Sequence, residues 1–205
     1  LSATRGELAG VDLAWSEVSG ATHYRIYRGV SADPAASAPL GAWVPSVRYS
    51  DDTAAPGVTY HYWVRSATSA LGHKAGPFGQ AAQGFRGLAV PGLLLSSTGD
   101  PDNISVGWQP VVGATHYQVY RTRDLENELA APISSWQTEL LFTDPDTEPG
   151  QTYHYWVRAA IDDAGGNASR FSEVSVGYRG LLAPAPPQVT SYRLGEVWLE
   201  WPAVP

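Results

Sequence analysis

The sequence Tyr60-His61-Tyr62-Trp63-Val64-Arg65 occurs a second time in this 205-residue chain, as Tyr153-His154-Tyr155-Trp156-Val157-Arg158. A second block, residues 21–28, returns at the same offset of 93 positions as residues 114–121. A fixed internal period indicates one structural unit used in series. No residue has been gained or lost between the two blocks, so both units should share one architecture.

The period also predicts where each unit begins and ends. Repeat 1 is expected at residues 1–89 and repeat 2 at residues 90–182. Residues 183–205 should form a stiff proline-rich linker and the first two strands of an incomplete third repeat. In that copy, Val197, Leu199 and Trp201 lie 93 positions beyond Ile104, Val106 and Trp108. Because no second sheet covers this apolar face, we expect the native chain to continue past Pro205, and the part after about Pro187 to be mobile or held by a neighbour.

The composition suits β-structure, since 11% of the residues are aromatic and only 16% are charged. A net charge of −7 without a basic stripe argues against nucleic-acid binding, which needs clustered cations. The lack of cysteine excludes disulfides, thiolate metal sites and cysteine nucleophiles. No run approaches the roughly 20 apolar residues of a membrane helix. Because methionine is also lacking, we expect a processed product or a fragment.

Alternation of apolar and polar residues predicts short strands in each repeat. In repeat 1 these strands are expected at residues 11–15, 24–28, 40–44, 47–50, 59–67 and about 78–85. Repeat 2 should contain their counterparts, including one around Trp136. Short strands at this spacing, with no helical period, favour an all-β fold of tandem seven-stranded antiparallel β-sandwiches.

Each repeat resembles a fibronectin type III domain of the bacterial kind. The matching residues are Trp15 and Trp108, the strands that start at Tyr24 and Tyr117, and the turns Pro56-Gly57-Val58-Thr59-Tyr60 and Pro149-Gly150-Gln151-Thr152-Tyr153. The resemblance implies an immunoglobulin-like sandwich, and usually an extracellular, non-catalytic spacer or adhesion role. The chain lacks Arg-Gly-Asp, so integrin binding through that motif is not supported.

The predicted structural core contains one aromatic set from each copy: Trp15, Tyr24, Tyr60, Trp108, Tyr117, Tyr153 and Trp201. Tyr60 and Tyr153 each follow a Pro-Gly turn by three residues, which predicts a tyrosine corner. In such a corner the phenol is partly buried and its hydroxyl bonds to the nearby backbone.

The best candidate binding surface is an outward row on two strands that are neighbours in the family's fold. It comprises His23, Arg25, Tyr27, His61, Trp63 and Arg65 in repeat 1, and His116, Gln118, Tyr120, His154, Trp156 and Arg158 in repeat 2. Exposed aromatic rings can stack on sugars or anchor a protein. The alternative is structural, with each indole flat beneath an arginine. The histidine pairs lack a carboxylate that would complete a metal site, so no metal is predicted.

Acidic clusters leave calcium open as a further ligand. They are Asp100-Pro101-Asp102-Asn103, Asp144-Pro145-Asp146, and Asp162-Asp163 with Asn167. Oxygen-rich loops can hold calcium, but Asp and Asn beside Pro and Gly are also ordinary turn residues. Asn103-Ile104-Ser105 and Asn167-Ala168-Ser169 match the short glycosylation pattern.

Three hypotheses for function follow. The leading one is a non-catalytic structural or adhesive array in a secreted or cell-surface protein, with partners that are neighbouring repeats or other copies in a fibre. The second is a module that binds a surface glycan or protein through the aromatic row. The third is an accessory region of a large secreted enzyme. No cofactor is expected, because no phosphate loop, nucleophile elbow or acid–base pair is recognisable.

Overall fold

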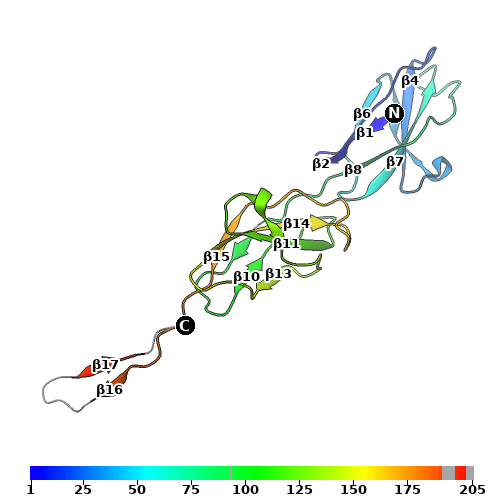
Figure 1. Cartoon of the computed structure of the whole chain (residues 1–205). Helices are drawn as coiled ribbons and strands as arrows, with labels where there is room; N and C mark the ends of the chain where they lie inside the picture. The colour runs from blue at the N-terminus through cyan, green and yellow to red at the C-terminus, as the bar shows by residue number, and fades with distance from the viewer. Residues whose placement is uncertain (93, 191–196, 202–205) are drawn as a thin grey trace.

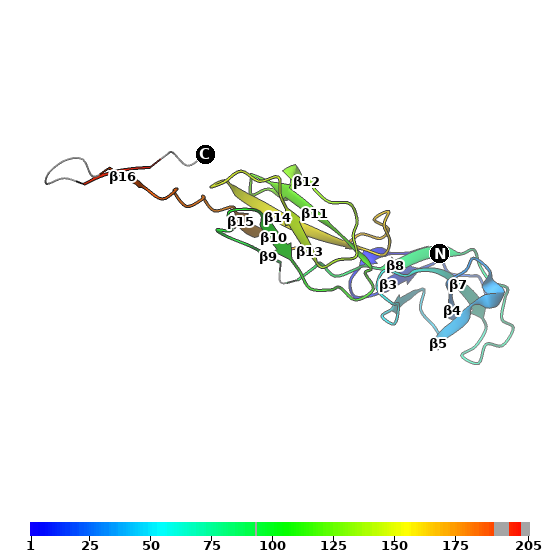
Figure 2. The same cartoon turned by 90° about the horizontal axis from the view of Figure 1, so that it is seen from below.

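The computed structural model describes residues 1–92, 94–190 and 197–201. This part of the chain is all-β, with two single-turn 3-10 helices, η1 (Pro34–Ala36) and η2 (Asn127–Leu129). Repeats 1 and 2 lie end to end, and the C-terminal segment continues away from repeat 2 (Figure 1). The view turned by 90° shows the same elongated arrangement (Figure 2). The described residues include no helix that is both long and apolar enough to span a membrane.

Repeat 1 is built from two sheets. One has the order β1-β3-β6, with β1 (Ser2–Ala3), β3 (Val11–Ala14) and β6 (Arg48–Asp51). The other has the order β2-β8-β7-β4-β5, with β2 (Arg5–Glu7), β8 (Ala82–Arg86), β7 (Thr59–Ala67), β4 (His23–Gly29) and β5 (Ala38–Val44). The N-terminal segment serves both sheets, because β1 pairs with β3 and β2 pairs parallel to β8.

Repeat 2 also has two sheets. One has the order β13-β10-β9, with β13 (Leu141–Asp144), β10 (Ile104–Gly107) and β9 (Leu95–Ser96). The other has the order β12-β11-β14-β15, with β12 (Ala131–Pro132), β11 (His116–Thr122), β14 (Thr152–Ala160) and β15 (Ser175–Tyr178). The central pairing is conserved between the repeats, since Tyr27 faces Trp63 and Tyr120 faces Trp156 across antiparallel strands.

Two predicted strands differ from the structure. The last strand of repeat 1 starts at Ala82 rather than near residue 78. Phe78 instead packs edge-on against Tyr27, with ring centroids 4.9 Å apart. In repeat 2 the strand expected around Trp136 is absent, and on the flank of β11 that faces away from β14 the structure has only β12 and one isolated bridge, Tyr117 to Gln137. β12 is an edge strand, and β2 pairs only with Phe85 and Arg86 of β8, so in both places one flank of the strand has no partner to enforce its register.

Each sandwich has its own hydrophobic core. The repeat 1 cluster is centred on Val11, Leu13, Ile26, Ala54 and Tyr62, with Trp15, Tyr60 and Val64 partly buried against it. The repeat 2 cluster contains Ile104, Val106, Trp108, Tyr117, Val119, Tyr153, Tyr155 and Val157, and also Leu88 from the connection between the repeats.

The third copy is represented by a hairpin of β16 (Gln188–Thr190) and β17 (Trp198–Glu200). Trp201 was predicted to be a core residue, but it is 56% exposed. The described part of this copy contains only one two-stranded sheet, so no second described sheet of this copy packs on the indole. Residues 191–196 and 202–205 of the expected third copy lie outside the described residues.

Candidate functional site: the aromatic rows and the joint between the repeats

The structure brings the predicted row together but does not expose its tryptophans. In both repeats the row lies on paired central strands, β4 with β7 and β11 with β14. Trp63 and Trp156 are each only 3% exposed, so the expectation of accessible indole faces is wrong. A Cβ placed on Gly29 would lie 3.4 Å from Ser37 and 3.6 Å from Trp63, which places the residue that follows η1 near the indole. Loops without a periodic pattern cover this face.

The arginines of the row hold these loops in place. Arg65 donates from Nε to the carbonyl of Gly76 at 2.8 Å and stacks over Phe78 at 5.3 Å. Arg158 donates in the same way to Ser169 at 2.9 Å and stacks over Phe171. The alternative interpretation, an arginine over each tryptophan, therefore named the right interaction but the wrong ring. These cation–π pairs contribute about 0.5–1 kcal/mol each at exposed sites.

The other members of the row also bond within their own repeat. Arg25 donates to the carbonyl of Gly41 at 3.1 Å, and Tyr120 donates to Gln118 at 2.7 Å. His23 and His116 bond to the hydroxyls of the preceding threonines, Thr22 and Thr115. His61 and His154 lie beside Trp63 and Trp156, with ring centroids 6.0 and 6.4 Å apart. Across the residues that the structure describes, no group of three His, Asp or Glu side chains converges as a metal site requires.

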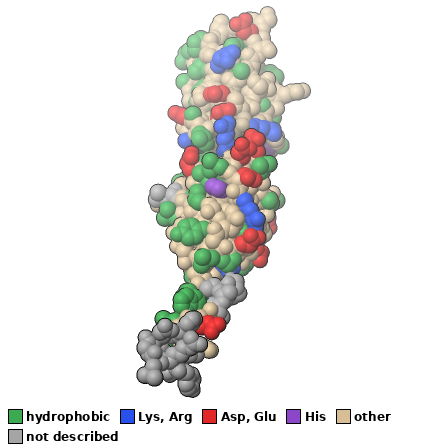
Figure 3. Space-filling view, turned by 60° about the vertical axis from the view of Figure 1, so that its left-hand side comes forward, with side chains coloured by type: hydrophobic (Ala, Val, Ile, Leu, Met, Phe, Trp, Pro, Cys, Tyr) green, Lys and Arg blue, Asp and Glu red, His purple; other side chains and the backbone are tan. Residues whose placement is uncertain are grey.

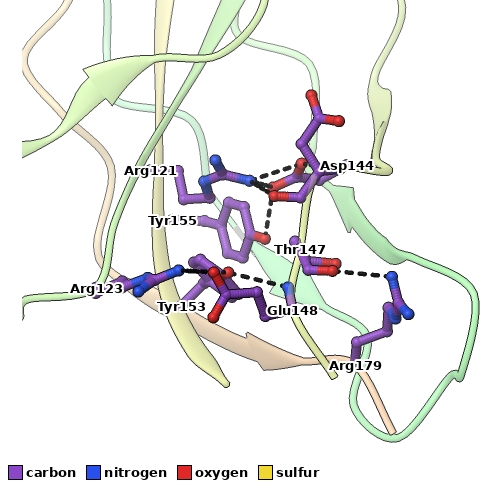
Figure 4. A network of polar contacts seen from close by, with 9 residues as sticks. Arg121, Arg123, Asp144, Thr147, Glu148, Tyr153, Tyr155 and Arg179 are labelled. Atoms are coloured by element: carbon purple, nitrogen blue, oxygen red, sulfur yellow. Dashed lines mark hydrogen bonds and ion pairs between the residues drawn. The ribbon is translucent and has the colours of Figure 1, made fainter. Parts of the chain in front are cut away.

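A buried polar network that the sequence analysis missed occurs in both repeats. In repeat 2, the hydroxyl of Tyr155 donates to Asp144 at 2.8 Å, and Arg121 donates to both carboxylate oxygens (Figure 4). In repeat 1, Tyr62 and Arg28 donate to Asp51 at 2.9 and 2.8 Å. The only signal in the sequence was that all three residue types recur at the 93-residue offset.

The network shifts the ionisation of its members. Burial alone would raise the pKa of Asp51, but hydrogen bonds from Thr53, Arg28 and Tyr62 outweigh it and lower that pKa below its usual value. Burial, reinforced by the bond to the carboxylate, raises the pKa of Tyr62 and of Tyr155 above the ordinary tyrosine value. At neutral pH, therefore, Asp51 is ionised and the phenols of Tyr62 and Tyr155 are neutral.

The predicted tyrosine corner forms in one repeat. The hydroxyl of Tyr153 accepts a hydrogen bond from the backbone N–H of Glu148 at 3.1 Å, and Glu148 also pairs with Arg123 (Figure 4). Among the described residues the Tyr60 hydroxyl makes no such bond, so the prediction is wrong for repeat 1. Repeat 1 has Val30 and Ala55 at the positions of Arg123 and Glu148, and the ring of Tyr60 lies under Arg28 at 4.5 Å.

The candidate ion sites at Asp144, Asp100 and Asp162 and the candidate glycosylation site at Asn167 already bond within the protein. The carboxylate of Asp144 is enclosed by Arg121, Tyr155 and the backbone N–H of Asp146, so it is not available to calcium. Asp100 and Asp162 accept bonds from nearby backbone N–H groups, as turn residues do. The amide of Asn167, one of the glycosylation matches, donates to repeat 1.

Asn167 belongs to the joint between the repeats. Its Nδ2 donates to the carbonyl of Gly57 at 2.8 Å and lies 3.1 Å from Oγ1 of Thr59. The backbone of Asn167 is in the left-handed region, with φ of 47°, a conformation that asparagine tolerates better than most residues. The Pro56-Gly57 turn thus leads into β7 and also presents the Gly57 carbonyl to repeat 2.

Glycines allow the two backbones to approach closely at the joint. A Cβ on Gly113 would lie 2.4 Å from the carbonyl oxygen of Pro56, and one on Gly57 would lie 2.6 Å from Ile161. Leu88 completes the contact, because it leaves repeat 1 and is 2% exposed within the core of repeat 2. Burying a leucine side chain contributes about 1.5–3 kcal/mol. A cleft of about 720 Å³ runs beside the joint, between Glu7–Ala9 and Asn167–Arg170.

The comparisons with known proteins identify the fold. No family model matches the sequence, and no curated protein matches it. Among solved structures, a segment of two fibronectin type III domains from chicken tenascin has a TM-score of 0.57 at 13% identity, covering 85% of this chain and 94% of that one. An Fn3-like protein from Clostridium thermocellum has 22% identity and a TM-score of 0.41, covering 47% and 97%. The FN1–FN3 domains of chicken CNTN1 have 18% identity and a TM-score of 0.40, covering 88% and 67%.

The likeness to the tenascin segment shows a fibronectin type III-like fold for this chain. That is the class of protein the structure defines: an all-β module with a fibronectin type III-like fold.

Proposed function

We propose that the chain is a non-catalytic segment of a rod of tandem seven-stranded sandwiches of bacterial fibronectin type III character, in a secreted or cell-surface protein. The joint carries this proposal. Leu88, Gly57 and Asn167 join the repeats by an apolar contact and a hydrogen bond instead of leaving a flexible tether. A joint of this kind transmits orientation from one repeat to the next, which is what a spacer or fibre requires.

The non-catalytic part of the proposal is supported by how the polar residues are used. The buried carboxylates Asp51 and Asp144 are each occupied by an arginine and a tyrosine. The row residues bond to their own loops. On the face shown in Figure 3, acidic and basic side chains are interspersed along the molecule, without a single-sign field for a charged substrate. Glycan or protein binding by the indoles is disfavoured because both indoles are buried.

Spin-label distance measurement tests the stiffness of the rod. Ser50 and Thr143 occupy equivalent exposed strand positions in the two repeats, and the native chain has no cysteine to interfere. With Ser50→Cys and Thr143→Cys labelled, we expect one narrow distance distribution. Adding Asn167→Gly, which keeps the positive φ and removes the amide, together with Leu88→Ser should broaden it. An equally broad distribution in the chain with an intact joint would contradict a stiff rod.

A further inference from the structure

An apolar pocket of about 380 Å³ lies at the end of repeat 1 that points away from repeat 2. It is lined by Leu1, Trp15, Val18, Tyr24 and Val64, with Pro77–Gln80 at its edge. Large open apolar hollows usually mark interaction sites. Each of the five lining residues has a counterpart 93 positions later in repeat 2. The surroundings of those counterparts indicate what would fill the repeat 1 pocket.

In repeat 2 the counterparts are Leu94, Trp108, Val111, Tyr117 and Val157, and all belong to one cluster with Leu88. Val111 is 8% exposed there, whereas Val18 is 48% exposed. Trp108 is buried, and Trp15 is only partly buried. The same pocket is therefore filled in repeat 2 by the connection from the preceding repeat and open in repeat 1.

Gly20 and Gly113, which are counterparts, independently show that this end of repeat 1 lacks the neighbour that repeat 2 has. Gly113 is in close contact with Pro56 of the preceding repeat, whereas a Cβ on its counterpart Gly20 would have no neighbour within 4 Å. Both glycines have positive φ, 86° and 78°, so repeat 1 already has the backbone shape that the contact requires.

The hydrogen-bonding position is also retained. Lys74 is the counterpart of Asn167, and these are the only two non-glycine residues with positive φ in the described chain, at 52° and 47°. Lys74 is exposed and is the one lysine of the sequence. An ammonium group, like the Asn167 amide, can donate to a turn carbonyl.

The opposite half of the joint recurs at the far end of repeat 2. Leu181 and Pro184 correspond to Leu88 and Pro91. Leu88 and Pro91 are both buried, whereas Leu181 is 74% exposed and Pro184 is exposed. The segment Leu88–Pro91 thus defines a plug of the form Leu-x-x-Pro, and the chain presents one open pocket and one open plug.

We propose that the repeat 1 pocket binds a Leu-x-x-Pro linker that enters Leu1 from a preceding repeat of the same kind, with Lys74 donating to the Pro-Gly turn of that repeat. The proposal extends the rod proposed above and rests on it. A covalently attached plug is favoured over a second molecule because association of separate molecules costs several kcal/mol of translational and rotational entropy. Attachment through the chain removes most of that cost.

The test adds the plug to the full chain. Residues 87–93 are copied ahead of Leu1, the place they occupy ahead of Leu94, and a matched control carries serine at the copied position of Leu88. We expect the leucine extension to shift the methyl resonances of Val18 and Val64 and to raise the unfolding midpoint of repeat 1 by several degrees. The serine extension should do neither. Equal effects of the two extensions, or no effect of either, would overturn the proposal.

A second molecule as occupant is distinguished by concentration. The Val18 resonances are followed during dilution of the unextended chain and of its Leu181→Ser variant. If they move in the unextended chain but not in the variant, the pocket binds the C-terminal segment of another copy. That result would also overturn the proposal. Failure of the pocket proposal in either experiment would leave the rod proposal standing, because the stiffness of the joint between Gly57 and Asn167 is measured separately by the spin-label distances.

Discussion

At the scale of single residues, the same buried ion pair occurs once in each repeat, as Arg28–Asp51 and Arg121–Asp144. Asp51 and Asp144 are almost inaccessible, and each receives an arginine and a tyrosine hydroxyl. A buried carboxylate is tolerated only when its oxygens are fully paired. The pairing spans the sandwich, since the aspartate ends β6 or β13 and its partners lie on the opposite sheet. The network therefore fixes how the sheets are aligned.

The pKa directions predict stability limits at both ends of the pH range. The folded-state pKa of Asp51 is lowered, so its contribution is complete above the unfolded value of about 3.9 and is lost as pH falls through the folded value. The folded-state pKa values of Tyr62 and Tyr155 are raised, so their contribution is complete below about 10 and is lost as pH rises further. Urea unfolding across pH 2–12 measures the free energy of unfolding on both the acidic and the alkaline limb of this pH dependence. Replacing both tyrosines by phenylalanine should flatten the alkaline limb; an unchanged limb would refute its assignment.

The tyrosine corner gives a matched pair of substitutions. Tyr153→Phe removes the bond from the Glu148 backbone and should lower the free energy of unfolding of repeat 2 by about 1 kcal/mol. Tyr60→Phe removes no comparable bond and should leave repeat 1 within about 0.5 kcal/mol of its original stability. Chemical unfolding of the two variants side by side decides this, and equal losses would count against it.

At the scale of elements, the central strands match their predicted positions most closely. Thr59–Ala67 forms β7 with the bounds expected, because β8 pairs with residues 59–62 and β4 with residues 61–67, so every residue of the strand has a partner. Segments that are paired on one flank alone differ from their predicted bounds: β8 is shortened at its start, and the edge strand β12 has only two residues. Short irregular segments cover the outward face of the central strand pairs, β4 with β7 and β11 with β14. The row predicted to bind a ligand is therefore packed against these segments.

Substitution of a row tryptophan distinguishes packing from binding. Trp156→Ala should lower the free energy of unfolding of repeat 2 by about 3–5 kcal/mol, because the indole is 3% exposed and its loss leaves a cavity. Trp63→Ala should act similarly on repeat 1. A solvent-facing binding residue would change stability by less than about 0.5 kcal/mol. Calorimetry of the two variants measures the difference, and near-native stability would restore the binding interpretation.

At the scale of the whole molecule, the two repeats share a joint built from both of them. Leu88 is supplied by repeat 1 and buried by repeat 2, so the stability of repeat 2 depends on its neighbour. Such nearest-neighbour coupling is the rule in repeat proteins.

The equivalent leucines provide the test. Leu88→Ala should lower the free energy of unfolding of repeat 2 by about 2–5 kcal/mol. Leu181→Ala, the same substitution one period later, should have an effect below about 0.5 kcal/mol because that side chain is exposed. Thermal unfolding of both variants provides the comparison. If the two variants lost stability equally, Leu88 would not be the residue that couples the repeats.

The sequence alone determined the period, the all-β class, the central strands and the inward positions of Tyr24, Tyr117 and Tyr153. These features follow from the two-residue alternation of a strand, which is written locally in the chain. It also indicated the pairing that brings His23, Arg25 and Tyr27 beside His61, Trp63 and Arg65, through the resemblance of each repeat to a known fold.

Only the tertiary structure decided which faces are covered and which polar groups meet. Alternation separates two faces but does not say whether a loop lies over the outer one, so Trp63 and Trp156 could not be predicted as buried. The Asn167–Gly57 bond joins residues 110 positions apart, and the Asp51 network joins opposite sheets. Such contacts depend on how whole sandwiches pack, and no local pattern records that packing.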